Sequence, residues 1–191
     1  RLCRMDSSPR PAVALLRGIN VGGKNIVSMA ELAQQFRDVG YGSVRTYIQS
    51  GNVVFTTSGG TSAELEDAVE QMLESWLGVP ITVVVLSAEE LDAVVEAAPE
   101  DHGAEHLRSD VLFLKRPLTP DQALAEFPPL REGVDGAAPG PGVVYFSRVA
   151  AQASKSRLTR IVGTPLYQRM TVRNWRTTTR LQELVRAAGE A

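Results

Sequence analysis

The sequence predicts an α+β protein, on three observations. Short apolar runs are typical of buried strands, and examples are residues 12–17 and the β-branched run at 81–86. Other segments carry apolar residues at every third or fourth position, which is the spacing of a helix with one buried face. The 191-residue chain is 43% hydrophobic and 22% charged, which is the composition of a globular protein long enough to bury a core.

The first half of the chain has six predicted elements in the order β-α-β-β-α-β. Ser28 and Glu31 form the capping box that starts the first helix, and Gly78 ends the second. The tripeptide SGN at 50–52 makes a tight turn between two strands. This order is the ferredoxin-like (split βαβ) topology, in which two helices cover one face of a four-stranded antiparallel sheet. The predicted elements are strands at 12–17, 43–49, 53–57 and 81–86, and helices at 28–40 and 65–77.

The second half is predicted to be a further α+β unit with a C-terminal helix. Ser87 and Glu90 form another capping box, and Pro120 suits the first turn of a helix. A weak strand near 133–137 would let this half repeat the β-α-β-β-α order that opens the first. The predicted elements are helices at 87–98, 119–127, 156–162 and 177–188, and strands at 110–115 and 143–147.

These elements divide the chain into a disordered leader at 1–11, a ferredoxin-like subdomain at 12–86 and a second subdomain at 87–191. The single cysteine, Cys3, lies in the leader, so no disulfide framework is expected. No segment approaches the roughly 18 apolar residues of a membrane-spanning helix, and the N-terminus lacks the apolar core of a signal peptide. We therefore expect a cytoplasmic protein with no membrane partner. The sequence does not specify its oligomeric state.

Positive charge gathers in the C-terminal part, although the net charge is only −2. Residues 148–186 hold nine basic residues and one acidic residue, so this segment carries +8 and the remainder −10. One interpretation is a surface for nucleic acid, and the other is internal pairing with the acidic part of the chain. The candidate nucleic-acid-binding residues are Lys155, Arg157, Arg160, Arg173, Arg176 and Arg180.

The opening loop, LLRGINVGGKN at 15–25, has the composition of a loop that approaches a ligand closely. Gly22 and Gly23 suit positive φ, and the loop is one substitution from a phosphate-binding P-loop. Asn25 stands where a P-loop needs a hydroxyl for Mg²⁺, and an antiparallel unit has the wrong topology, so nucleotide hydrolysis is disfavoured. A cradle of backbone and side-chain donors for an anion remains the better interpretation.

The stretch TVRNWRTTTR at 171–180 also has the chemistry of an anion site. Asn174 or Thr177 can cap the final helix, which places the positive end of the helix beside Arg173 and Arg176. Trp175 is either a stacking platform or, more commonly for such a residue, an anchor of the C-terminal helix to the core.

Other functional patterns are weak. The first strand lacks the aromatic residues on which a standard RNA-recognition module stacks bases. The segment SGNVVF at 50–55 matches the signature of that module only at Gly51 and Phe55. His102 and His106 have the spacing of two metal ligands on a helix, but Gly103 favours a solvated acidic loop. No catalytic triad or paired carboxylates stand out, so no catalytic residue, metal or cofactor is assigned.

Four stretches, LLRGINVGGKN, TYIQSGNVVF, RIVGTPLY and TVRNWRTTTRL, together resemble the bacterial family known as domain of unknown function 1697. The resemblance runs from about residue 12 to residue 184. It implies a two-part α+β protein with ferredoxin-like topology, and it brings no agreed activity or catalytic residue. The family pattern more often has RNWNT where this chain has RNWRT, so the resemblance does not extend to Arg176.

We therefore predict an anion-binding groove between the two halves, and three functions remain open. The first is a non-catalytic binding module for a phosphate-bearing partner, with nucleic acid favoured over a phosphorylated small molecule. The second is an enzyme that acts on a small anionic metabolite, and the third is a structural or interaction protein. The candidate ligand-binding residues are Arg17, Asn20, Gly22, Gly23, Lys24, Ser50, Asn52, Arg173, Asn174 and Trp175.

Overall fold

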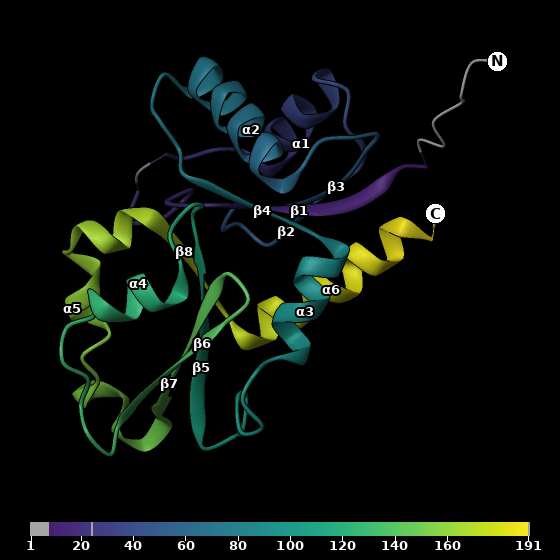
Figure 1. The fold of residues 1–191 in the computed structure, drawn as a ribbon. Helices are drawn as coiled ribbons and strands as arrows, with labels where there is room; N and C mark the ends of the chain where they lie inside the picture. The colour runs from purple at the N-terminus through teal and green to yellow at the C-terminus, as the bar shows by residue number, and fades with distance from the viewer. Residues whose placement is uncertain (1–7, 24, 191) are drawn as a thin grey trace.

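The computed structural model of the protein describes residues 8–23 and 25–190. These residues form two four-stranded antiparallel sheets with helices packed against them (Figure 1). The predicted α+β class is confirmed. Cys3, most of the leader and Lys24 lie outside the described residues.

The first sheet has the strand order β2-β3-β1-β4, with every neighbouring pair antiparallel. Its elements are β1 (Arg10–Leu16), α1 (Met29–Asp38), β2 (Gly42–Tyr47), β3 (Asn52–Thr57), α2 (Ser62–Leu77) and β4 (Val83–Ser87). Helices α1 and α2 cover one face, where alternate strand residues such as Ala14, Phe55 and Val85 are buried with them. The opposite set, including Val13 and Val54, is buried in a second cluster, so both faces of the central strands are covered.

The second sheet has the strand order β6-β7-β5-β8, which corresponds one to one with the order in the first. Its elements and the adjoining helices are α3 (Ala88–Glu96), β5 (Leu107–Leu114), α4 (Pro120–Ala125), β6 (Asp135–Gly140), β7 (Val143–Val149), η1 (Ala150–Lys155), α5 (Thr159–Val162), η2 (Pro165–Arg169), β8 (Met170–Asn174) and α6 (Trp175–Gly189). Strand β6 is the weak strand that the sequence predicted near 133–137.

Helix α6 carries the C-terminus back from the second half onto the first. It packs with α3 against β1 and β3, on the face of the first sheet opposite α1 and α2 (Figure 1). Its buried residues include Leu181, Leu184 and Val185, the stripe predicted from the sequence. Because these leucines share one cluster with β1 and β5, the two halves are parts of one packed structure.

The structure departs from the predicted elements in three places. Strand β1 begins at Arg10, so residues 10 and 11 of the predicted leader belong to the sheet. The helix predicted at 156–162 is only the short α5, preceded by the 3₁₀ turns of η1. Strand β8 was not predicted, because an arginine occupies a buried position where a strand pattern needs an apolar residue.

A group of charged side chains forms hydrogen bonds to the backbone along the outer edge of β4, and we call this group the ion cluster. Glu70 and Glu66 accept hydrogen bonds from the backbone N–H groups of Val83 (2.8 Å) and Val85 (3.1 Å). The carbonyls of the same two residues accept from Lys115 and Arg116. Such a covered edge offers no free ladder for another strand. The cluster consists of Glu66, Glu70, Glu90, Lys115 and Arg116.

Candidate functional site

The opening loop is held in shape by Asn20. The Asn20 Oδ1 accepts a hydrogen bond from Val27 N (2.7 Å), and its Nδ2 donates to Val27 O and to Gln49 O (both 3.0 Å). Gly22 and Gly23 have φ angles of 60° and 74°, which side chains rarely adopt. Asn20 therefore ties the loop to the turn between β2 and β3 and is occupied by backbone partners.

The SGN turn meets the end of β1 closely. A Cβ at Gly51 would lie 2.9 Å from the Leu16 Cβ, so glycine allows this approach. Asn52 is fully buried, and its Nδ2 donates to Ser50 Oγ at 3.1 Å. The Asn52 Oδ1 accepts from Arg173 Nε at 2.5 Å, which links the turn to β8. The second and fourth motifs of the sequence are thus in direct contact.

Arg173 is buried, with 7% of its surface exposed, and we call its hydrogen-bond set the Arg173 clasp. Every nitrogen of the guanidinium donates to an acceptor within the protein, and none of those acceptors is a carboxylate. Burial lowers the Arg173 pKa to about 10, so the side chain still carries its charge at neutral pH. The acceptors are Asn52 Oδ1, Thr171 Oγ1 (2.8 Å), Val172 O (2.9 Å), Leu16 O (2.9 Å), Ser50 O (3.0 Å) and Gly51 O (3.3 Å).

Arg17 lies nearby but is bound differently. Its Nε donates to Tyr167 O at 3.0 Å, and its Cζ lies 4.8 Å from the centroid of the Tyr167 ring. Among the described residues, no hydrogen bond is made by the two terminal nitrogens of Arg17. The guanidinium is therefore oriented by one bond and one aromatic face, while its outer donors remain open to a ligand.

These groups border a hollow of about 490 Å³, which we call the motif cleft. It lies where β1 and the opening loop meet β8 and η2, so all four motif stretches reach it. Among its described lining residues there is no carboxylate, imidazole or thiol. Val21 and Val162 line it although 62% and 50% of their surfaces are exposed. The lining residues are Leu16, Arg17, Gly18, Val21, Asn25, Ser50, Val162, Tyr167, Met170, Thr171, Val172 and Arg173.

The structure brings together only part of the predicted ligand-binding set. Arg17, Ser50 and Arg173 line the motif cleft, and Asn52 lies behind Arg173. Asn174 caps α6 by accepting from Thr177 N (2.8 Å), and together with Trp175 it lines a separate hollow. Lys24 lies outside the described residues.

The sequence prediction missed the contributions of α5 and η2 to the cleft. Tyr167 orients Arg17, and Val162 borders the cleft, but neither was named as a site residue. Their motif, RIVGTPLY, contributes to the sequence prediction only through the family resemblance. The sequence signal for this contribution is Tyr167, which follows Gly163 and Pro165, two residues typical of turns.

Three of the six predicted nucleic-acid-binding residues have partners within the protein. Arg173 is buried in the clasp, Arg180 pairs with Glu183, and Arg157 donates to backbone carbonyls. Within the described part of the chain, Lys155, Arg160 and Arg176 are exposed and have no ion pair. The other cations of the segment pair as Arg148–Asp110, Arg169–Glu126 and Arg186–Asp92.

His102 is not in a solvated turn, contrary to the sequence prediction. It is 8% exposed, with its ring edge-on to Trp175 (centroids 4.9 Å apart) and near Tyr145 (5.3 Å). Burial lowers the His102 pKa. A Cβ at Gly103 would lie 2.2 Å from Trp175, so the loop packs directly on the indole ring. His106 is exposed, and no group of three metal-ligating side chains is found in residues 8–23 and 25–190.

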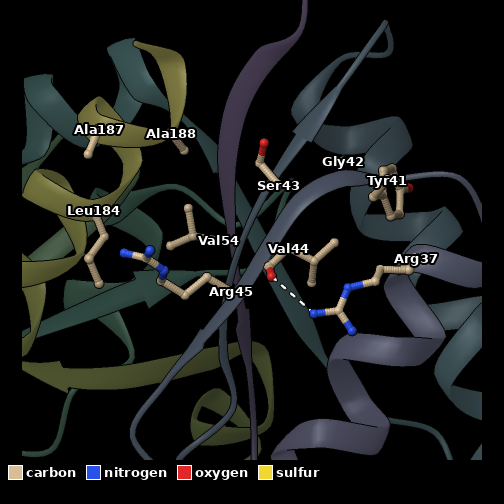
Figure 2. Close-up of a pocket in the computed structure, with 10 residues that line it drawn as sticks. All are labelled: Arg37, Tyr41, Gly42, Ser43, Val44, Arg45, Val54, Leu184, Ala187 and Ala188. Atoms are coloured by element: carbon tan, nitrogen blue, oxygen red, sulfur yellow. Dashed lines mark hydrogen bonds between the residues drawn. The ribbon is translucent and has the colours of Figure 1, made fainter. Parts of the chain in front are cut away.

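A larger hollow of about 620 Å³ lies between the β2 edge and the end of α6 (Figure 2). Arg37 and Arg45 line it, and Arg37 Nη2 donates weakly to Val44 O at 3.4 Å. None of the predicted ligand-binding residues lines this hollow. We therefore treat the motif cleft as the candidate site and use this hollow as a comparison surface.

A solved structure has the same overall fold. It is the conserved bacterial protein SP0830 from Streptococcus pneumoniae, with a TM-score of 0.78 and 28% sequence identity over 93% of this chain and 99% of that chain. The search of curated proteins finds no match. In the part of the chain that is described, no helix has the length and apolar character needed to cross a membrane.

The family comparison covers the first two of the four motif stretches, at 15–25 and 46–55. The family model described as "Protein of unknown function (DUF1697)" matches residues 10–145, which is more than half of the chain. That range includes β1, the opening loop and the SGN turn, which form one side of the motif cleft. The chain belongs to the DUF1697 family.

Proposed function

We propose that the protein is a binding module for a phosphate-bearing partner and that the motif cleft holds the phosphate. The observation that carries the proposal is the open end of Arg17, fixed over Tyr167 in a cleft without an acidic lining residue among those described. A guanidinium held in this way can donate two parallel hydrogen bonds to a phosphate.

The buried charge of Arg173 also favours the binding of an anion in the motif cleft. Its donors are all used, so it does not bind the ligand directly, but its charge is not cancelled by a carboxylate partner. Because charges interact more strongly in a partly buried site than in water, this second cation favours an anion beside Arg17. The Ser50 hydroxyl and the backbone of the opening loop offer further donors.

The lining favours binding over catalysis. The lining hydroxyls of Ser50, Thr171 and Tyr167 can act in acid-base or nucleophilic catalysis only with an activating group beside them, such as a carboxylate or imidazole. The described lining residues supply none of these. We therefore rank an enzyme acting on an anionic metabolite below a binding module.

The size and apolar edge of the cleft favour a nucleotide-like ligand. A volume of about 490 Å³ falls within the usual range for small-molecule sites. Val21 and Val162 offer apolar surface beside the cation, which suits a ligand with a planar or apolar part next to its phosphate. The nucleic-acid form of the hypothesis loses support at this site, because most cations of the 148–186 segment are paired or buried.

A structural role for the basic segment is the second candidate. Its support is the set of ion pairs that join Arg148, Arg169 and Arg186 to acids outside the segment. Such pairs on a surface contribute little stability individually. This role is compatible with ligand binding in the motif cleft.

We also propose a more specific description of the fold and its setting. The strand order β2-β3-β1-β4, with α1 and α2 on one face, supports a ferredoxin-like unit, and the order β6-β7-β5-β8 supports a repeat of it. We keep the division into subdomains at 12–86 and 87–191 and a cytoplasmic location as parts of this proposal.

The test is a calorimetric titration with inorganic phosphate, nucleoside mono-, di- and triphosphates and sugar phosphates. We expect saturable binding of at least one nucleotide and a loss of about ten- to a hundredfold in Arg17→Ala, since charge-assisted hydrogen bonds contribute about 1.5–3 kcal/mol. Arg17→Lys should recover only part of the affinity, because lysine keeps the charge and lacks the planar fork. Arg45→Ala, which removes one charge elsewhere, is the matched control. Equal affinity in Arg17→Ala and wild type would contradict the proposal, as would no binding of any phosphate compound.

A further inference from the structure

Two arginines lie next to each other on adjacent strands of the second sheet. Arg108 on β5 and Arg148 on β7 are direct partners in the antiparallel register. Like charges in this position destabilise a sheet. Arg148 is neutralised by Asp110 at 2.8 Å and also lies opposite Asp135 on β6, whereas Arg108 is exposed and has no ion pair with a described residue. The sheet thus keeps a cation where a neutral side chain would be more stable.

The pair lies where two hollows adjoin, at the end of the second sheet that points away from the first (Figure 1). Both arginines line both hollows, of about 570 and 610 Å³. We call the combined surface the arginine groove. Its lining residues include Arg108, Arg148, Ser154, Ser156 and Thr159 on one side and Ser109, Asp110, Trp175, Arg176 and Thr179 on the other.

Positive charge dominates this groove. Three arginines line it against one carboxylate, Asp110, among the described residues. Lys155 and Arg160 are exposed and lie next in sequence to the lining residues Ser154 and Thr159. At the other end, Asp101 and Glu105 are exposed beside the lining residue Gly103, so the cationic part extends from Arg176 toward η1.

We infer that the arginine groove binds the backbone of a single-stranded nucleic acid. A chain of phosphates fits better than one ion, because the cations are spread along two adjoining hollows. Trp175 lines one hollow and is half-buried, with His102 and Gly103 packed on its indole ring, so a base would contact the remaining exposed surface of this residue. Hydroxyl groups supply neutral donors to phosphate and sugar oxygens. The groove shares no lining residue with the motif cleft, so this inference is independent of the proposed function.

Fluorescence anisotropy with labelled single-stranded RNA and DNA of about 12 nucleotides tests the inference at several salt concentrations. The test variant is Arg108→Ala with Arg176→Ala. The control is Arg37→Ala with Arg45→Ala, which removes the same charge from the hollow in Figure 2. We expect the test pair to lose about tenfold or more in affinity at low salt. Its salt slope should fall by about 1 to 1.5, because two phosphate contacts disappear. The control pair and Arg17→Ala should change little.

Tryptophan fluorescence provides a second measurement. The chain has two tryptophans, so Trp76→Phe leaves Trp175 as the only indole. Trp76 packs against the core of the first sheet, away from the groove. Oligonucleotide addition should quench Trp175 with the same midpoint as the anisotropy change.

Three results would overturn the inference. One is no saturable binding to either nucleic acid at low salt. Another is an equal loss in the test and control pairs, which would indicate a general effect of net charge. The third is competition by polyglutamate as effective as unlabelled oligonucleotide, which would assign the groove to acidic protein partners.

Discussion

Cations of the second half contact the first half in the Arg173 clasp and in the ion cluster, and the partners of these cations differ. In the Arg173 clasp the acceptors are carbonyl, amide and hydroxyl oxygens, all of them neutral. In the ion cluster Lys115 and Arg116 meet carboxylates, including Glu66 at 3.1 Å from the Lys115 amine and Glu90 at 2.7 Å from Arg116. One contact leaves a positive charge in place, and the other cancels it.

Because of this difference, the ion cluster can only stabilise the fold, whereas the Arg173 clasp can also attract an anionic ligand. Both contacts use buried or half-buried charge, so breaking either should destabilise the folded state. Only the clasp leaves an uncancelled cation under a cleft. We therefore expect the ion cluster to affect stability alone, and the residues around the clasp to affect stability and anion binding in different proportions.

Replacing Arg173 should have the largest effect on stability. Arg173→Ala leaves Leu16 O, Ser50 O and Asn52 Oδ1 without their donor and removes a buried side chain. We expect a loss of about 3–5 kcal/mol in the free energy of unfolding, measured by urea denaturation. Arg173→Lys should also destabilise, because lysine cannot reach all these acceptors. Arg176→Ala, on the exposed neighbour, should change stability by less than about 0.5 kcal/mol. A similar loss in both alanine variants would contradict the clasp.

Replacing Glu66 should have the next largest effect. Glu66 is 1% exposed and bonds to Lys115, Arg116 and the Val85 N–H. Glu66→Gln keeps the shape and removes the charge, and we expect a loss of about 2 kcal/mol. Ligand binding in the motif cleft should not change, since Glu66 is not among its lining residues. Lost phosphate affinity in this variant would show that the two contacts are not separable.

Arg17→Ala tests whether phosphate binding can be reduced without a large loss of stability. Arg17 makes one hydrogen bond and one aromatic contact, so its removal should cost about 1 kcal/mol or less in stability. Phosphate binding should fall far more, as described above. Thermal denaturation and calorimetry on the same preparation measure both quantities. A stability loss equal to that of Arg173→Ala would mean that Arg17 is structural.

The smallest expected effect is a pH dependence from His102, which packs on Trp175 at the start of α6. Burial depresses the folded-state pKa of His102 below the unfolded value. Its contribution to stability is therefore present above the unfolded pKa, about 6.5, and is lost as the pH falls toward the folded value. His102→Phe should remove that part of the pH dependence in urea denaturation, whereas His106→Ala, at an exposed position, should not. Identical pH profiles in wild type and His102→Phe would contradict this assignment.

Several local features followed from the sequence because their causes lie within a few residues. Ser87 and Glu90 form the predicted capping box, and Gly78 ends α2 with a left-handed φ of 71°. The central strands were visible because each contains an uninterrupted run of apolar residues. Strand β8 gave no such pattern, because its buried arginine interrupts the apolar run and is stabilised partly by acceptors on β1 and the SGN turn, which are distant in sequence.

The sequence by itself determined the α+β class, the approximate positions of most helices and the stretches from which a site would be built. Those features depend on local propensity, capping and periodic burial. Only the tertiary structure decided which polar residues are free. Arg17 and Arg173 both lie in motif stretches, but Arg17 keeps open donors, whereas Arg173 donates to oxygens of its own strand and to oxygens more than 100 positions away in the chain. Hydrogen-bond satisfaction depends on contacts between segments distant in sequence, and no local pattern encodes it.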